Sequence, residues 1–287
     1  MKLPVALTIA GSDSGGGAGI QADLKTFAVL GVHGTSAITA VTAQNTQGVI
    51  DYLELPASLI RDQISAVVDD IGVQAAKTGM LSSVAIIDAV AQAIRDFQLR
   101  RLVVDPVMVA KGGARLLRQN AVAALREKLV PLASVVTPNL PEAEVLLDRS
   151  IRTLDERRQA ARDLVAMGAR AAVVKGGHAE DDATDVFFDG SQMIELPGRR
   201  IKTTNTHGSG CVFSAAIAAG LARDLEPLEA VRQAKAFITE AIANSLEIGH
   251  GHGPVNPMSG IEHGRLSFSS HEQAQARPPA SRRRIER

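Results

Sequence analysis

A glycine-rich turn at residues 207–211, HGSGC, runs into the alanine-rich stretch VFSAAIAAGL and carries the only cysteine of the chain, Cys211. The first backbone N–H groups of a helix lack partners within it, and the helix dipole adds partial positive charge there. The turn therefore predicts a site for an anion, or for charge that develops during phosphoryl transfer. The same dipole is expected to lower the pKa of Cys211 from about 8.5, which makes it a candidate base. The alternative is that Cys211 is a small buried apolar residue.

Two carboxylates, Asp105 in DPVMVAKGG and Glu142 in TPNLPEAE, follow runs that are typical of strands. Proteins usually hold Mg²⁺ with one or two carboxylates together with substrate phosphates and water, so the pair is a candidate magnesium site. The alternative is structural. Asp105 can start a turn, and Glu142 can lie in the first turn of a helix, where the macrodipole favours an acid.

Three more polar residues, Gln44, Lys77 and Lys175, stand in similar positions after apolar runs. A sheet with a purely structural purpose needs turn residues there, but it does not need an amide and two lysines. Because ligands bind beyond the carboxyl ends of the strands in an open parallel sheet, these side chains are candidates for ligand binding.

The stretch GSDSGGGAGIQAD at residues 11–23 has the glycine content of a phosphate-binding loop but neither familiar spacing. It lacks the Gly-Lys-Ser/Thr ending of a P-loop, and its glycines do not fit G-x-G-x-x-G. The next predicted strand ends in Thr42 and Gln44 rather than in an acid for a ribose, which disfavours a Rossmann site. Two interpretations remain open, a turn that lets a ligand approach the backbone and a plain loop.

The elements that must position these residues follow from the hydrophobic pattern. Short β-branched runs alternate with longer stretches whose apolar residues are three and four apart, which indicates an α/β fold with a mainly parallel sheet. We expect strands over residues 5–10, 35–42, 73–77, 101–105, 134–137 and 171–175, and a ribbon of alternating polarity over 186–196. We expect helices over residues 19–30, 58–70, 82–97, 119–129, 141–147, 154–167, 209–223 and 227–248.

The composition narrows the class of partner. The chain has 287 residues, is 45% apolar and carries 31 acidic and 31 basic residues. The size allows a large core, and the charge balance argues against nucleic acid or an anionic membrane, so we expect a small-molecule partner. The N-terminal apolar run is too short for a signal peptide, no stretch nears the roughly 18 apolar residues of a span, and one cysteine excludes an internal disulfide. We expect a cytoplasmic protein.

No repeat or linker divides the chain before residue 264, so we expect a single domain over residues 1–263. Residues 264–287 are polar and arginine-rich and end in RPPASRRRIER. Such a sequence buries little apolar surface, and we expect a disordered tail. The GHGHG segment at residues 249–253 lacks a third ligand at suitable spacing, so no metal site is expected there.

Taken together, these motifs resemble the hydroxymethylpyrimidine/phosphomethylpyrimidine kinases of thiamin biosynthesis, within the ribokinase-like superfamily. The resemblance is carried, in chain order, by GSDSGGGAGIQADLKTF, AVTAQNTQGV, KTGML, DPVMVAKGG, TPNLPEAEVL, VVKGGH and THGSGC, and it extends from about Leu7 to Pro257. It implies a ribokinase-like three-layer α/β/α fold, ATP as phosphoryl donor, Mg²⁺ as cofactor and, as is common in the family, a homodimer. The implied reactions are phosphorylation of 4-amino-5-hydroxymethyl-2-methylpyrimidine and then of its monophosphate.

The resemblance also implies roles for single residues. Gly208, Ser209 and Gly210 match the family's anion hole, and Cys211 takes the place of the aspartate base of related sugar kinases. Gln44 matches the glutamine that binds the pyrimidine, and an amide can both donate to a ring nitrogen and accept from an exocyclic amine. The other implied roles are association with Mg²⁺ for Asp105 and Glu142, a position near the ATP phosphates for Lys175, and substrate contact for Gly11, Ala18, Asp23, Met80 and Val107.

The chain departs from the family pattern at two positions. Ser209 and Val212 stand where threonine is common; the serine keeps a hydroxyl, whereas the valine does not. The alternatives are a pyridoxal kinase of the same branch, whose substrate is also a flat ring bearing a CH₂OH group, and a non-catalytic pyrimidine-binding protein. The joint presence of four residues argues against the second, because binding without transfer does not require groups that act on phosphate; they are Asp105, Glu142, Lys175 and Cys211.

Overall fold

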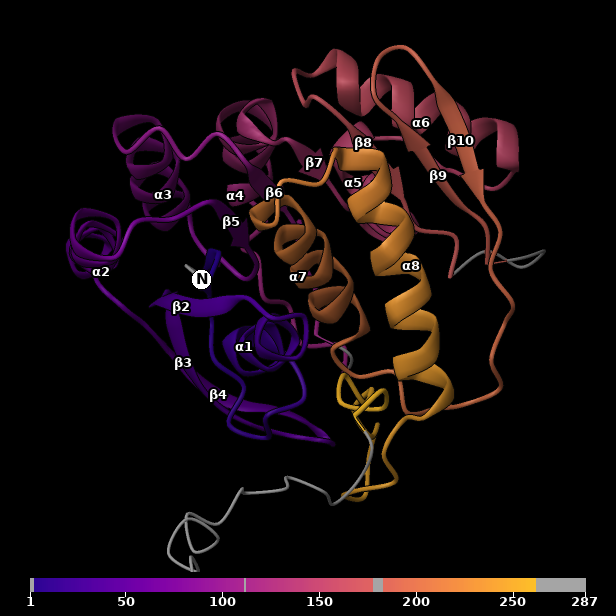
Figure 1. Ribbon diagram of the computed structural model, residues 1–287, viewed down its shortest axis with the longest axis horizontal. Helices are drawn as coiled ribbons and strands as arrows, with labels where there is room; N and C mark the ends of the chain where they lie inside the picture. The colour runs from indigo at the N-terminus through magenta and orange to yellow at the C-terminus, as the bar shows by residue number, and fades with distance from the viewer. Residues whose placement is uncertain (1–2, 111, 178–182, 262–287) are drawn as a thin grey trace, which may run out of the picture.

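The computed structural model describes residues 3–110, 112–177 and 183–261. Within them, eight strands form one sheet in the order β10-β9-β8-β7-β6-β5-β1-β2, and β3 and β4 pair separately. From β2 to β8 in this order the neighbouring strands are parallel, and β9 and β10 are added antiparallel. The predicted α/β fold with a mainly parallel sheet is confirmed (Figure 1).

The bounds of the elements mostly follow the hydrophobic pattern. The strands are β1 (Val5–Ala10), β2 (His33–Ile38), β3 (Ala40–Asn45), β4 (Gly48–Glu54), β5 (Ala75–Thr78), β6 (Leu102–Val104), β7 (Val135–Val136), β8 (Ala172–Val174), β9 (Asp185–Phe188) and β10 (Met193–Leu196). The helices are α1 (Gly19–Val29), α2 (Ala57–Asp70), α3 (Val84–Asp96), α4 (Ala121–Ala124), α5 (Leu140–Leu147), α6 (Leu154–Ala166), α7 (Ser209–Ala222) and α8 (Pro227–Ala243).

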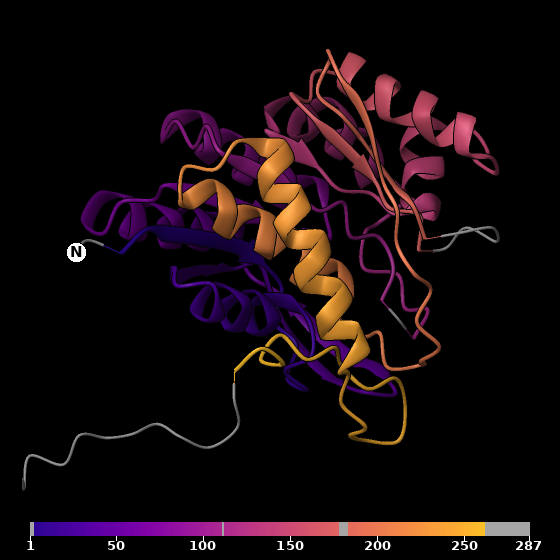
Figure 2. The same ribbon diagram turned by 45° about the vertical axis from the view of Figure 1, so that its right-hand side comes forward.

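Alternate residues of the central strands point to opposite faces of the sheet and enter two separate cores. On β1, Leu7 and Ile9 join the core that α2, α3, α5 and α6 cover, whereas Ala6 joins the core of α1, α7 and α8. On β6, Val104 belongs to the first of these cores and Val103 to the second. The three-layer α/β/α arrangement is therefore confirmed, with α7 and α8 side by side over one face (Figure 2).

Helix α7 is buried almost all round. Its residues from Val212 to Ala222 are all buried, and five of these eleven are alanines. Small side chains let the sheet, α1 and α8 approach closely. A Cβ atom added at Gly220 would meet the Cβ of Ala230 at 2.8 Å. This packing fixes the position of the first turn of α7, where the predicted anion site lies.

The single strand predicted over residues 35–42 is wrong. The chain leaves the main sheet after Ile38, and β3 pairs instead with β4, a strand that the sequence pattern did not predict. Thr39 makes the transition, because its hydroxyl donates to Met80 O at 2.7 Å and its N–H donates to Ala10 O at 3.0 Å. β4 has no buried residue, so it offers no apolar face to recognise. We call the β3–β4 pair the flap.

Two helix predictions are corrected as well. The helix expected over residues 119–129 is α-helical only from Ala121 to Ala124 and continues as a π-helical turn over Leu125–Leu129. We find no physical reason for the π turn. The helix expected to reach residue 248 ends at Ala243, because the chain beyond it bonds to another segment, with Leu246 N–H donating to Pro254 O at 2.9 Å. The predicted ribbon is the β9–β10 hairpin.

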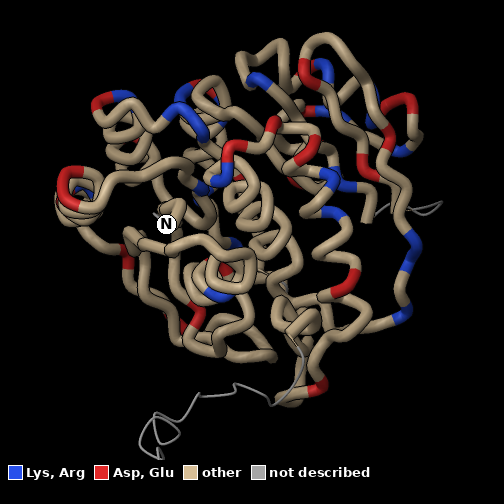
Figure 3. The backbone as a smooth tube through the Cα atoms, in the orientation of Figure 1, with Lys and Arg blue, Asp and Glu red and all other residues tan. Residues whose placement is uncertain are grey.

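The surface agrees with the balanced composition. Over the described residues, acidic and basic positions are interspersed along the backbone, without a large region of one sign (Figure 3). Among the same residues, no helix combines the length and the apolar character needed to cross a membrane. The tail predicted for residues 264–287 lies outside the described residues.

Candidate active site

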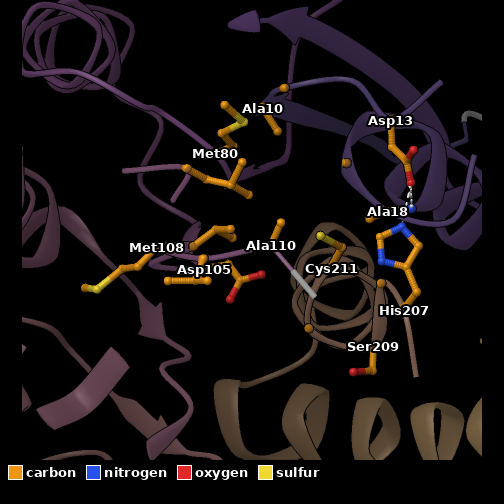
Figure 4. Close-up of a pocket in the computed structure, with 18 of the residues that line it drawn as sticks. Ala10, Asp13, Ala18, Met80, Asp105, Met108, Ala110, His207, Ser209 and Cys211 are labelled. Atoms are coloured by element: carbon orange, nitrogen blue, oxygen red, sulfur yellow. Dashed lines mark hydrogen bonds and ion pairs between the residues drawn. The ribbon is translucent and has the colours of Figure 1, made fainter. Parts of the chain in front are cut away.

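A pocket of about 500 Å³ opens at the carboxyl ends of the parallel strands. Parallel strands deliver their following turns to one edge of the sheet, so segments far apart in sequence meet there. Figure 4 shows side chains from these segments around the pocket. Of the residues predicted for the site, the pocket is lined by Gly11, Ala18, Gln44, Met80, Asp105, Val107, Glu142, Lys175, Gly208, Ser209, Gly210 and Cys211.

The anion site is built where two glycine turns touch. Gly208 precedes the first residue of α7 with φ +76°, and a Cβ atom there would lie 1.8 Å from Gly17 O. Only glycine permits both this backbone conformation and this approach. Ser209 N–H donates to Thr206 O at 3.2 Å, whereas among the described residues no acceptor is recorded for the N–H groups of Gly210 and Cys211. These two amides of α7 are open to an anion, and no acceptor is recorded among the described residues for Gly208 N–H either.

Asp105 is held by three neighbours. Its Oδ1 accepts from Thr137 Oγ1 and from Lys175 Nζ, each at 3.3 Å, and its Oδ2 accepts from Ser214 Oγ at 3.0 Å. Burial disfavours the charge of Lys175, but the carboxylates of Asp105 and Glu142 raise the pKa of Lys175 above its ordinary value. The lysine is therefore a fixed positive charge at the pocket wall.

Glu142 lies in the first turn of α5, as its structural interpretation expected. Its Oε2 accepts from Asn139 N–H at 2.8 Å, and Asn139 Oδ1 accepts from Glu142 N–H at 2.9 Å, which forms a capping box. Burial, together with the nearby charge of Asp105, raises the pKa of Glu142 to about 7, although Lys175 acts in the opposite direction. A cation beside Glu142 would stabilise its ionised form and lower this pKa.

The donor set fits a Mg²⁺ ion that is held jointly with phosphates. Asp105 and Glu142 both line the pocket and both offer oxygen ligands. The described residues contain no group of three or more His, Cys, Asp or Glu side chains that could hold a metal by themselves. A site of two carboxylates completed by substrate phosphates and water is the chemistry these residues allow.

The expected pKa of Cys211 is wrong in direction. The residue keeps intermediate exposure at the pocket wall, but its thiol is enclosed by protein. Burial raises the pKa of Cys211 to about 11, and the charges of Asp23 and Asp105 add to the rise. The charge of Lys77 and a hydrogen bond from the backbone of Gly19 oppose it without reversing it. Burial outweighs the helix dipole, because the free-energy penalty for removing a thiolate from water is larger than the stabilisation that the dipole provides.

Asp23 does not line the pocket. It is fully buried beneath it, where its carboxylate accepts from Lys77 Nζ at 2.8 and 3.0 Å and from Thr8 Oγ1 at 2.6 Å. Asp23 therefore acts on the pocket through its contact with Lys77 and through its charge, which also affects Cys211. The sequence pointed to Lys77 as a polar strand end but gave it no role.

Asp13 and His207 were missed by sequence reasoning, although both line the pocket. The Nε2 atom of His207 lies 2.8 Å from Asp13 Oδ2, and both residues are buried (Figure 4). Asp13 lies in the N-terminal glycine turn and His207 directly precedes Gly208, so the pair ties the two turns together. The only available signal was that each residue stands inside a glycine-rich motif.

Gln44 is carried by the flap and is anchored through its backbone. Its N–H and C=O both bond to the hydroxyl of Ser14, at 2.7 and 2.6 Å, which leaves the side chain to face the pocket. The GHGHG segment supports the flap from outside, because His252 N–H donates to Thr46 O at 2.8 Å. Val212 is fully buried and does not line the pocket. The hydroxyl of a threonine at this position would therefore lie in the core and not in the pocket.

Comparisons with known proteins agree with this site. The sequence matches the family described as "Phosphomethylpyrimidine kinase" over residues 13–256. It is 51% identical over 258 residues to the hydroxymethylpyrimidine/phosphomethylpyrimidine kinase of Bacillus subtilis, covering 89% of this chain and 95% of that protein. The ADP complex of Bacillus subtilis pyridoxal kinase superposes with a TM-score of 0.84 at 43% identity, covering 90% of this chain and 98% of that chain. The phosphomethylpyrimidine kinase of Clostridium difficile superposes with a TM-score of 0.76 at 41% identity, covering 84% and 100%.

Proposed function

The chain belongs to the phosphomethylpyrimidine kinase family and has the ribokinase-like fold of its structural neighbours, and we propose that it makes a pyrimidine diphosphate for thiamin biosynthesis. ATP phosphorylates 4-amino-5-hydroxymethyl-2-methylpyrimidine first, and a second ATP phosphorylates the monophosphate. The observation that carries the proposal is the meeting, in one pocket, of two open α7 amides, the Asp105–Lys175 pair and the flap glutamine Gln44.

Phosphoryl transfer depends mainly on alignment and on stabilisation of charge. In the proposed arrangement, the N–H groups of Gly210 and Cys211 receive the transferring phosphoryl group. Lys175, kept charged by its two acidic neighbours, stabilises the phosphates of ATP. Gln44 reads the aminopyrimidine edge, and Gly11, Ala18 and Met80 form the wall against which the ring packs. No added atom fits freely at Gly11, where a Cβ would lie 3.0 Å from Met80 Sδ.

The two acceptors differ in their need for a base. The first acceptor is a neutral alcohol, whose oxygen attacks best as its proton leaves. Cys211 is the base proposed for this step, and only its thiolate can take the proton. Because the thiol has a pKa of about 11, on the order of one part in ten thousand is thiolate at pH 7. The second acceptor is a phosphate that is already largely ionised near neutral pH and needs no such base.

Mg²⁺ is the proposed cofactor, bound by Asp105 and Glu142 together with phosphate oxygens. When bound, the ion neutralises charge on the phosphates. Support comes from the raised pKa of Glu142 beside Asp105, which marks a place where a cation is favoured. The protein's own part is to hold the two carboxylates, one through Thr137 and Ser214 and the other through the capping box with Asn139.

Pyridoxal phosphorylation is the second candidate activity, favoured by the 43% identity to the Bacillus subtilis pyridoxal kinase. A panel of hydroxymethylpyrimidine, its monophosphate and pyridoxal, each with ATP and Mg²⁺, separates the two. We expect the highest kcat/KM with the two pyrimidines, measured as product formed by mass spectrometry. A higher kcat/KM with pyridoxal than with the pyrimidines would make pyridoxal phosphorylation the main activity. ATP consumption that does not depend on any of these acceptors would contradict both candidate activities.

A homodimer is part of the proposal. It is supported by exposed apolar side chains on the flap strand β4, where Ile50 and Leu53 are 77% and 69% exposed. Apolar surface of this kind is commonly covered by another chain. Sedimentation equilibrium of the wild-type protein and of Leu53→Lys tests it, with a loss of dimer expected in the variant. The cytoplasmic location stays a prediction.

A further inference from the structure

His207 is fixed in one orientation by its neighbours. Its Nε2 lies 2.8 Å from Asp13 Oδ2, so that edge of the imidazole faces the carboxylate. Gly17 covers the same edge, because a Cβ atom on this glycine would lie 2.5 Å from Cδ2 and 3.2 Å from Nε2 of His207. The opposite edge, with Cε1 and Nδ1, is what the residue presents to the pocket that it lines (Figure 4).

The Nδ1 atom of His207 has no recorded partner within the described part of the chain. The residue is 8% exposed, and the ring's only recorded hydrogen bond there is the one to Asp13. Nδ1 is not among the fully enclosed polar atoms that lack a partner, so it opens to the pocket that the residue lines. It is therefore available to a ligand group in the pocket.

The carboxylate of Asp13 does not repel an anion bound on the far side of the ring. It accepts N–H groups from Gly15, Gly17 and Ala18 at 2.9, 3.0 and 2.8 Å, in addition to His207. Burial works against its charge, but His207 and these backbone groups together lower the pKa of Asp13 below its ordinary value. Its charge is thus satisfied locally, and its effect on His207 is to hold the ring and to favour a proton on Nε2.

We propose that His207, oriented by Asp13, binds the phosphate of the monophosphorylated acceptor through Nδ1. This inference rests on the proposed function. His207 lines the same pocket as Ala18, on the wall for the pyrimidine, and as Gly210 and Cys211, whose open amides receive the transferring group. With the ring held by Gln44, the phosphate of the phosphomethyl group lies on the side of these amides. From there one of its oxygens attacks the γ-phosphorus of ATP, and ADP leaves.

The chemistry of the second acceptor suits an imidazole at this place. The phosphate carries oxygens that can accept a proton or, when protonated, donate one, so a single proton can join the ring and the phosphate in either of two arrangements. With the proton on Nδ1, an imidazolium donates to the dianion; with the proton on phosphate, the P–O–H group donates to Nδ1. The first acceptor, a neutral alcohol, has no such group, so His207 distinguishes the second transfer from the first.

Two variants separate phosphate binding from structural support. In His207→Gln the side-chain amide reaches roughly the place of Nε2, so it keeps a donor for Asp13 and loses the group at Nδ1. In His207→Asn the shorter amide lies near Nδ1 and loses Asp13. We expect His207→Gln to lower kcat/KM for the monophosphate at least about tenfold more than for the alcohol, as is usual for losing a hydrogen bond to a charged group. His207→Asn should retain more of the preference for the monophosphate than His207→Gln does.

Equal losses with both acceptors in His207→Gln, or a larger loss with the alcohol, would overturn the inference and assign His207 to support of the turns. Titration calorimetry with the monophosphate in the absence of ATP gives a readout that does not require transfer. The dissociation constant should rise about tenfold in His207→Gln relative to wild type, with little change for the alcohol. If the wild-type protein transfers phosphate to neither pyrimidine, the proposed function fails, while this binding comparison still decides the role of His207.

Discussion

The ammonium group of Lys77 lies 2.8 Å from the carboxylate of Asp23, and neither side chain is exposed to solvent. Burial alone would lower the pKa of Lys77, but Asp23, with smaller effects from Cys211 and Asp105, raises it above its ordinary value. Burial raises the pKa of Asp23 above its ordinary value, although the charge of Lys77 and hydrogen bonds from Lys77 and Thr8 act against this. The short contact between the two groups favours the ionised pair. Lys77 lowers the pKa of the Cys211 thiol against the effect of burial.

Removing one member of this pair should be more harmful than removing both. Asp23→Ala leaves an unpaired buried ammonium, and we expect the free energy of unfolding to fall by about 3–5 kcal/mol. The double variant Asp23→Leu/Lys77→Met should lose less than either single variant. Urea denaturation followed by circular dichroism measures all of them. Additive losses in the double variant would contradict the coupling.

The first phosphorylation should depend on pH through Cys211. Below the pKa of about 11 the thiolate fraction rises about tenfold per pH unit, so kcat/KM for the alcohol should rise about a hundredfold between pH 7 and 9. The second transfer should stay nearly flat over this range, because its acceptor is already ionised. Cys211→Ala should abolish the rise and slow the first transfer much more than the second. Parallel pH profiles of kcat/KM for both acceptors would mean that Cys211 lines the pocket without acting as a base.

Gln44→Leu should raise KM for the pyrimidine tenfold or more while leaving KM for ATP nearly unchanged, since only the acceptor edge loses its partner. Gln47→Leu is the matched control, because Gln47 is an exposed glutamine at the tip of the same flap. Initial rates with each substrate varied in turn give both constants. A rise in KM for ATP of the same size would mean that the flap supports the whole site rather than the pyrimidine.

Gly208→Ala should impair catalysis rather than merely stability. The added methyl group would lie 1.8 Å from Gly17 O, so one of the two turns must move, and a displacement of about 1 Å can cost a hundredfold in rate. Gly31→Ala isolates the cost of the backbone conformation. Gly31 has φ +72° with nothing within 4 Å of an added Cβ, so only about 1–2 kcal/mol of stability should be lost. Similar kcat/KM in the two variants would refute the steric argument.

Stability in metal-free buffer should fall as pH rises, because of Glu142. The folded-state pKa of about 7 lies above the ordinary 4.5, so the folded state binds the extra proton between these values. The free energy of unfolding should therefore decrease by up to about 3 kcal/mol from pH 4.5 to pH 7.5, with other groups superimposed. Glu142→Gln removes the titrating group but keeps an oxygen that can accept from Asn139 N–H. It should flatten this part of the curve of unfolding free energy against pH, measured in EDTA. A slope unchanged by the substitution would contradict the raised pKa.

The residues that could be predicted from the sequence are those that follow parallel strands. Asp105, Glu142 and Lys175 come after separate apolar runs, and the rule that such ends meet was enough to place them in one pocket. The anion turn before α7 was equally visible, because its glycines and the helix pattern are local in sequence. Parallel order also made the two-sided burial of the sheet predictable.

What could not be predicted depends on contacts across the chain. The flap was missed because β4 has no buried face, and a period-two pattern needs one. Asp13 and His207 are 194 residues apart, and no local rule pairs them. The pKa of Cys211 was wrong in direction because the dipole of α7 is a local property, whereas the enclosure of the thiol is made by distant segments.

The bond between Asp13 and His207 also sets an order of events during synthesis. A ribosome adds about 5–20 residues per second, so on the order of 10–40 s separate the appearance of the two partners. Throughout that interval the N-terminal glycine turn has no imidazole to hold it and no α7 turn to rest against. The nascent chain therefore completes its catalytic cavity late, after β1 has gained both of its neighbouring strands, β2 and β5.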